Sequence, residues 1–428
     1  MTKYSEPRPP SPAGQVSLRS PAELADALPY LMGFHPDDSI VMVAVHGGRG
    51  RFGGRLRLGI PREPREWPAV AEQLARCLVA GSARRRGRPD GVIVFLCQDP
   101  PDGESGREVA ERLRPLSREL RLACGALEVP VLEALCVAGG RFWSYCCPDP
   151  RCCPEEGTPL APRGTSVMAA ASAYAGLPVV GSLREMEARF APIRPGAVAQ
   201  EAALDAAAAR LVPRILDGTG REAVQEETLA LAERLLHRFA RRPAAGGGPA
   251  ADTGDDALLD PGEAAELLLG LQDRTTRDRA AEWMEGPEAE PALRLWRALA
   301  RRCVGAYAEH AAAPLTLAGW VAWSTGDEPA ARAALGLALR ADPEYVFARL
   351  LHEGTNEGVD PEVLRGCLRE ERAARRAAGA RPEGRPAGGS RRGGRPAGRA
   401  PGGTRPPVAG DRRRGARRTG LAEGKGRS

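Results

Sequence analysis

The chain has 428 residues, 43% of them apolar, which is enough for roughly two to three domains with a hydrophobic core. Its net charge of +6 is unevenly spread, because residues 371–428 hold 17 Lys and Arg against 4 Asp and Glu, so the preceding part is mildly acidic. No run approaches the ~18 apolar residues of a membrane span and no secretory signal opens the chain, so we expect a soluble, cytoplasmic protein with reduced cysteines and no membrane contact.

The first part of the chain predicts an α/β domain. Residues 1–17 are rich in Pro and Ser and predict a disordered leader. Ser20 can cap a following helix and Gly33 can end it. Apolar runs then alternate with helical patterns, which favours a mixed sheet with flanking helices over residues 18–190. The expected strands are Ile40–Val45, Phe52–Ile60, Val92–Leu96, Val129–Val137 and Arg141–Cys146, with helices over about Ala69–Ala80 and Ser105–Cys124.

The cysteine loop, residues 146–153, follows the last of these strands. Two adjacent cysteine pairs flank the turn-forming sequence Pro-Asp-Pro-Arg. Three interpretations stay open: thiolates from both sides of the turn hold a zinc ion, two of the thiols form a redox-active disulfide, or the cysteines are small packed residues. The spacing is not that of a common zinc knuckle, because only Cys147 and Cys152 have a suitable separation.

Polar residues between the first helix and the first strand include the residue types of a hydrolytic triad, namely His35, Asp37, Asp38 and Ser39. Neighbours in one turn do not converge as a triad requires, so we expect a turn and capping role for them. Ligands of open α/β sheets usually bind beyond the carboxyl ends of strands. The candidates there are Gln98-Asp99 and His46, and they form no motif, so the sequence favours a protein without catalytic activity.

The second part of the chain predicts helices. Residues 191–242 form a helical segment, 243–257 a linker or exposed loop, and 258–378 a helical domain. Within the last, residues 314–347 resemble a single tetratricopeptide repeat, in which small residues let two antiparallel helices cross closely. This hairpin is expected to pack on its helical neighbours and to leave the helical half as a surface for a protein partner; a peptide-binding groove is the alternative.

The C-terminal residues 379–428 are rich in Arg, Gly and Pro and contain no aromatic residue. They predict a disordered tail whose charge favours nonspecific contact with nucleic acid or another polyanion, without base stacking. Of the two interpretations, the sequence favours a solvated tail without a partner, because the high arginine content also reflects a compositional bias of the whole chain.

Three ordered segments resemble an actinobacterial family known as domain-of-unknown-function family 4192. They are LRSPAELADALPYLMGFHPDDSIVMVAV, WSYCCPDPRCCPEEGTPL and GDEPAARAALGLALRADPEY, and the resemblance covers about Leu18 to Leu351. It implies that Cys147, Cys152 and Cys153 match the cysteines of the family motif, whereas Cys146 is a local addition. These three are therefore the candidate metal ligands, with zinc as the candidate cofactor. The resemblance implies a bacterial origin and supplies no activity.

Three functional hypotheses follow. The first is a non-catalytic interaction or scaffold protein. The second is a zinc-binding or redox-sensing protein that uses the cysteine loop. The third is an enzyme that acts on a small anionic metabolite at the α/β domain.

Overall fold

The computed structural model describes residues 18, 20–48, 50–149, 151–162, 164–174, 179, 181–216, 220–242 and 248–379. The predicted leader and, apart from Gly379, the predicted tail lie outside the described residues.

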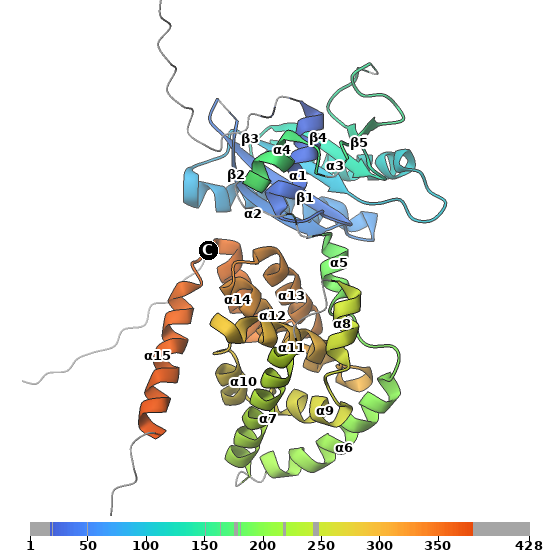
Figure 1. The fold of residues 1–428 in the computed structure, drawn as a ribbon. Coiled ribbons are helices and arrows are strands. Elements are labelled where there is room, and N and C mark those ends of the chain that lie inside the picture. Colours follow the sequence, from blue (N-terminus) through green and yellow to red (C-terminus); the bar gives the residue numbers. More distant parts are fainter. Residues whose placement is uncertain are drawn as a thin grey trace, which may run out of the picture. The chain divides into compact units, whose positions relative to one another are not determined.

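A six-stranded mixed sheet forms the centre of the α/β domain, with strand order β2-β1-β3-β4-β5-β6 (Figure 1). β3 and β4 run parallel, and every other neighbouring pair is antiparallel. This architecture confirms the predicted mixed sheet. The strands are β1 Ser39–His46, β2 Arg51–Gly59, β3 Gly91–Cys97, β4 Val131–Ala138, β5 Arg141–Ser144 and β6 Thr158–Pro159, of which only the short β6 was not predicted.

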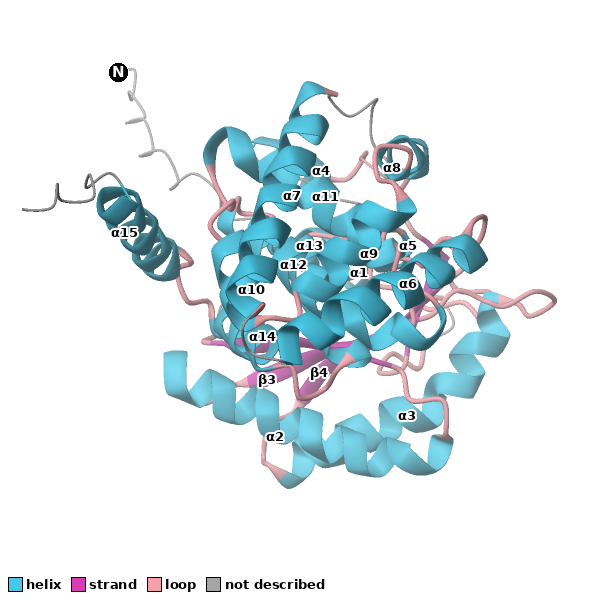
Figure 2. Ribbon diagram, turned by 90° about the horizontal axis from the view of Figure 1, so that it is seen from below, coloured by secondary structure: helices cyan, strands magenta, loops and turns pink. Residues whose placement is uncertain are grey.

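Both faces of the sheet are covered, as the side chains of β1 show. Ile40, Met42 and Ala44 pack in one core cluster with α2 (Trp67–Arg86) and α3 (Gly106–Ala126), which lie side by side across the strands in Figure 2. The alternate residues of β1 pack in a second cluster with α1 (Pro21–Met32). Burial on both faces explains why β1 is a continuous apolar run and does not alternate.

The helical half follows a short helix α4 (Val167–Tyr174) and has its own core cluster. Its centre is α12, in which all thirteen residues are buried. None of the described helices is both long and apolar enough to cross a membrane. The helices are α5 Leu183–Ala188, α6 Ala197–Leu216, α7 Arg221–Arg241, α8 Pro249–Asp256, α9 Pro261–Gly270, α10 Arg274–Ala280, α11 Ala289–Arg301, α12 Ala312–Ser324, α13 Glu328–Ala341, α14 Val346–Glu357 and α15 Glu362–Gly379.

The predicted crossing of two helices in residues 314–347 is made by α12 and α13. A Cβ atom on Gly319 would lie 2.7 Å from Cγ of Leu335 and 3.3 Å from the carbonyl oxygen of Ala331. Only glycine therefore permits this approach, because a side chain would push the helices apart.

Two elements differ from the predictions. Part of the stretch predicted as a linker or exposed loop, 243–257, is the helix α8, and its Asp252 and Asp255 are buried. Composition rich in Gly, Pro and Asp suggested exposure, but buried arginines of other helices pair with these carboxylates. The helical pattern over Ala292–Ala311 predicts one continuous helix, but α11 ends at Arg301, and Gly305 adopts the left-handed conformation, which a continuous helix does not tolerate.

Arginines of α11 hold α7 and α8 in place. Arg294 donates to the Asp255 carboxylate at 3.0 Å and to the backbone oxygens of Phe239 and Arg242 at 3.2 and 2.7 Å, where α7 ends. The side chains of Arg294 and Asp255 are only 6% and 4% exposed. Arg294 thus neutralises a buried carboxylate and satisfies carbonyl groups that a helix end leaves without partners.

We predict that Asp255→Ala lowers the free energy of unfolding by about 3–5 kcal/mol, because it removes the buried carboxylate that pairs with the buried Arg294 guanidinium. The matched control is Glu290→Ala, which removes the other carboxylate of Arg294 from a position that is 62% exposed and 3.5 Å away. That control should cost about 1 kcal/mol or less. Urea denaturation of both variants measures the difference, and equal losses would contradict the assigned role of Asp255.

Candidate functional site

The base of the cysteine loop is fixed to the edge of the sheet. β6 pairs with β5 through Arg141 and Phe142, which closes the loop. The Arg141 guanidinium donates to the carbonyl oxygens of Glu156 and Gly157 at 2.7 and 2.8 Å. Trp143 Nε1 donates to the carbonyl oxygen of Glu155 at 3.0 Å. Long side chains of β5 thus hold the returning chain, so the turn between the cysteine pairs has a defined position.

Two tight turns aim the cysteines at one another. The backbone N–H groups of Cys146 and Cys147 donate to Ser144 Oγ at 3.1 and 3.0 Å. Those of Cys152 and Cys153 donate to the carbonyl oxygen of Asp149 at 3.1 and 2.8 Å. Each cysteine pair therefore turns around a polar atom that precedes it.

Three of the four sulfur atoms converge. The Sγ atoms of Cys147, Cys152 and Cys153 all lie within 4.8 Å of one another, and this group can hold a metal ion. Cys146 instead packs against the core cluster beneath α2 and α3. Among the described residues, no further His, Cys, Asp or Glu joins the group. The arrangement thus supplies three thiol ligands and leaves one position of a tetrahedral site open.

The thiol of Cys153 is hard to ionise without a cation. Burial, followed by hydrogen bonds and charge interactions with Cys147 and Cys152, raises the pKa of Cys153 to about 12. A bound divalent ion would reverse this effect at Cys153, because it stabilises the thiolate that burial and the neighbouring sulfurs disfavour. All ten cysteines carry free thiols in the structure.

The turn before β1 carries hydrogen bonds that join the α/β domain to α5. Asp37 accepts from the backbone N–H of Arg184 at 2.9 Å, and Asp38 accepts from the Arg184 guanidinium at 2.9 Å. Asp38 also accepts from Gln98 at 3.1 Å, and Ser39 Oγ accepts from Arg57 Nε at 2.8 Å. These contacts accord with the expected turn role.

The remaining candidates at the carboxyl ends of strands are also bonded to neighbours. His46 Nε2 lies 2.9 Å from Ser82 Oγ, and Asp99 accepts from the backbone N–H of Gly139 at 3.2 Å.

A cavity of about 360 Å³ opens beside β3, and its described lining contains the carboxyl groups of Asp26, Asp37 and Asp99 with neither Lys nor Arg. This lining repels an anion and does not favour the anionic metabolite expected for the α/β domain.

Sequence reasoning missed a second concentration of polar groups, inside the helical half. Arginines 294, 297, 301 and 302 share one side of α11 and its end, although the helix lies in the core. The last three follow Arg294 by three, seven and eight residues, which places them on the same side of a helix. This spacing could have indicated buried charges with partners, because charged residues on the buried face of a helix require them.

The structure places the chain in a class of two-part proteins, in which an α/β domain carries a thiol-rich loop at the edge of its sheet and an all-helical half follows. Comparison with protein-family models matches residues 21–362 to the family described as "Domain of unknown function (DUF4192)". The chain belongs to this family. Neither the search of curated proteins nor the search of solved structures found a match.

We predict that Arg141→Ala loosens the cysteine loop, because it removes both side-chain hydrogen bonds to Glu156 and Gly157. The thiols of the metal-free protein should then react several-fold faster with a thiol reagent, in proportion to the larger open population. Arg151→Ala is the control: its side chain is exposed, and the bond that Arg151 makes to Asp149 uses its backbone N–H. Equal rates in the two variants would show that Arg141 does not hold the loop.

Proposed function

We propose that this protein acts by binding and not by catalysis, and that Cys147, Cys152 and Cys153 hold a zinc ion at the edge of the α/β domain. The observation that carries this proposal is the convergence of the three sulfur atoms. Zn–S bonds of about 2.3 Å place two ligand sulfurs about 3.8 Å apart in a tetrahedral site, so small side-chain shifts suffice.

The zinc ion would stabilise the loop in the way that a short crosslink does. Cys147 lies on one side of the turn and Cys152 and Cys153 on the other, so an ion bound by all three joins the two ends. The open fourth position is available to a water molecule or to a side chain of a partner. Soft thiolate ligands favour zinc over magnesium or calcium.

A partner-binding role belongs to the helical half in this proposal. The two helices α12 and α13 pack closely, and α12 is buried at every residue, which supports the hairpin as a packing unit and not as a peptide groove. On α14, Val346 and Leu350 are 65% and 62% exposed, as expected for a surface that meets a protein partner. We also retain polyanion contact by the basic tail 379–428 and a cytoplasmic location, which suits free thiols.

Elemental analysis of the protein purified under reducing conditions tests the zinc site. We expect about one zinc ion per chain, and loss of that zinc in the Cys152→Ser/Cys153→Ser variant, with a fall in thermal stability. Cys146→Ser is the matched control, because Cys146 is the neighbouring cysteine whose sulfur is outside the group. It should keep the metal.

If the purified wild-type protein contains no zinc, the proposed site is refuted. A disulfide found by mass spectrometry between two of the three cysteines, without metal, would instead favour redox sensing. Zinc that is lost equally in Cys146→Ser would show that the ligand set is wrong.

The pH dependence of zinc affinity follows from the state of the thiols. Since the pKa of Cys153 is raised to about 12, the metal-free thiol is protonated at neutral pH and zinc binding releases its proton. Affinity should therefore rise with pH, by roughly tenfold per unit for each proton released. The stability of the metal-free protein should show the opposite trend. Because folding favours the neutral thiol, the contribution of Cys153 to the free energy of unfolding is fully present below about pH 9 and is lost as the pH rises to about 12. Chelator competition at several pH values measures the first trend, and a flat profile would contradict thiolate binding.

A further inference from the structure

A cavity of about 900 Å³ lies in the helical half among α5, α8, α11 and the start of α13. Its wall combines apolar side chains, notably Met186, Phe190 and Ile193, with charged groups. The charged residues of the lining are Arg189, Arg297, Arg301, Arg302, Glu185, Asp252, Asp256 and Asp327. The volume of this cavity and its mixture of apolar and charged walls are typical of a binding site for a small organic ligand.

Two of the carboxylates in this wall are bonded to arginines. Asp252 accepts two hydrogen bonds from Arg189, at 2.9 and 3.0 Å. Asp256 accepts from Arg301 at 3.0 and 2.8 Å. These two arginines therefore have their counter-ions within the protein.

The other two carboxylates cap helices. Glu185 accepts from the backbone N–H of Ser182 at 2.6 Å, before α5. Asp327 accepts from the backbone N–H of Ala330 at 3.1 Å, at the start of α13. Among the residues that the structure describes, neither carboxylate lies within ion-pair distance of an arginine of the cavity wall.

Arg297 is the arginine in this wall whose guanidinium no described protein group binds. Its Nε atom is buried without a hydrogen-bond partner, and its guanidinium carbon lies 5.9 Å from the centre of the Phe190 ring. Burial, and then the nearby charge of Arg189, lowers the pKa of Arg297 to about 10, so the group is still charged at neutral pH. Arg297 is partly exposed, and the negative charges of Asp252 and Asp327 offset its burial only in part, so a bound anion would supply the acceptor that Nε lacks.

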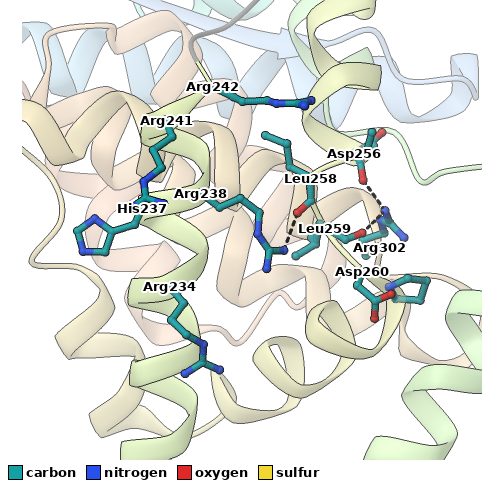
Figure 3. Close-up of a pocket in the computed structure, with 12 residues that line it drawn as sticks. Arg234, His237, Arg238, Arg241, Arg242, Asp256, Leu258, Leu259, Asp260 and Arg302 are labelled. Atoms are coloured by element: carbon teal, nitrogen blue, oxygen red, sulfur yellow. Dashed lines mark hydrogen bonds between the residues drawn. The ribbon is translucent and has the colours of Figure 1, made fainter.

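Arg302 supplies a second unsatisfied donor in the same wall. One of its terminal nitrogens donates to the backbone oxygens of Asp256 and Leu259, both at 2.8 Å (Figure 3). The other donates to Gln200 Oε1 at 3.1 Å. Its Nε atom is buried without a partner, and the residue is only 8% exposed. Arg302 therefore has its position fixed by neutral oxygens and adds positive potential without a carboxylate of its own.

We propose that this cavity binds a small organic monocarboxylate, with its carboxylate on Arg297 and its apolar part against Met186, Phe190 and Ile193. A planar guanidinium matches a carboxylate through two parallel hydrogen bonds. One unpaired guanidinium balances one negative charge, and the carboxylates of Asp252 and Asp327 disfavour a dianion such as a phosphate monoester. The apolar walls favour an organic acid over a bare inorganic anion.

A basic groove on the surface of α7 is the competing place for an anion, and it adjoins the same Arg302. Figure 3 shows Arg234, Arg238 and Arg241 along one side of that helix, with Arg302 across the groove. These α7 side chains are exposed, and Arg238 is already bonded to Glu263 at 2.9 Å. Exposed arginines are hydrated and bear no burial cost, so they do not require a ligand.

Titration calorimetry of the full chain with benzoate and with octanoate tests the proposal, with phenyl phosphate and inorganic phosphate as comparison anions. We expect one site per chain for the carboxylates. Arg297→Gln should weaken binding by roughly tenfold to a hundredfold, which corresponds to loss of a charge-assisted bidentate contact. The matched control Arg234→Gln removes an exposed charge of the α7 groove and should leave binding unchanged.

Thermal melting without ligand separates a binding role from a structural one. Because Arg297 forms no hydrogen-bonded ion pair with a described carboxylate, Arg297→Gln should melt at the same temperature as the wild type or higher. Arg297→Lys is the second variant: it retains the charge without the planar fork, and should fold and bind with intermediate affinity.

Several results would overturn the proposal. They are absence of binding by both carboxylates at millimolar concentration, tighter binding of phenyl phosphate than of benzoate, and binding lost in Arg234→Gln but retained in Arg297→Gln. A lower melting temperature in Arg297→Gln together with unchanged carboxylate affinity would also assign the residue to structure alone.

Discussion

The buried ion pair between Arg294 and Asp255 is the interaction on which the helical half depends. It lets α8, which contains three Asp as well as Gly and Pro, pack in a core, and the same guanidinium satisfies the end of α7. Arg301 repeats this arrangement with the Asp256 carboxylate and the carbonyl oxygen of Asp252. Arg302 binds only neutral oxygens, namely the carbonyl groups of Asp256 and Leu259 and the side chain of Gln200. The cost of burying these charges is offset because each meets several oxygens at hydrogen-bond distance.

Arg297 departs from this arrangement, and so do the thiols of the cysteine loop. Each is a polar group that the fold holds in place without giving it the partner that its charged form requires. For Arg297 that partner is an anion, and for Cys147, Cys152 and Cys153 it is a cation. The two proposed sites lie in different parts of the chain and have opposite charge requirements, so each can be tested without affecting the other.

Local signals in the sequence were sufficient for much of the α/β domain. The apolar run of β1, the cap at Ser20 and the glycine at residue 33 each act within a few neighbours, and α1 and β1 are where these signals predicted them. The candidate ligands Cys147, Cys152 and Cys153 also came from the sequence, through a family motif. That their sulfurs converge depends on the hydrogen bonds of Ser144, Asp149 and Arg141, whose geometry no spacing rule contains.

The sequence by itself determined the elements whose causes are local: the mixed α/β pattern, the helical second half and the turn between the cysteine pairs. Tertiary structure decided where charges are buried. Composition marked α8 as exposed, because Asp is seldom buried and Gly and Pro are typical of loops, and only the approach of Arg294 from another helix makes burial of Asp255 possible. The cavity at Arg297 was likewise not predictable from the sequence. Whether an arginine has a partner depends on residues far away in the chain, and local sequence patterns do not predict such long-range contacts.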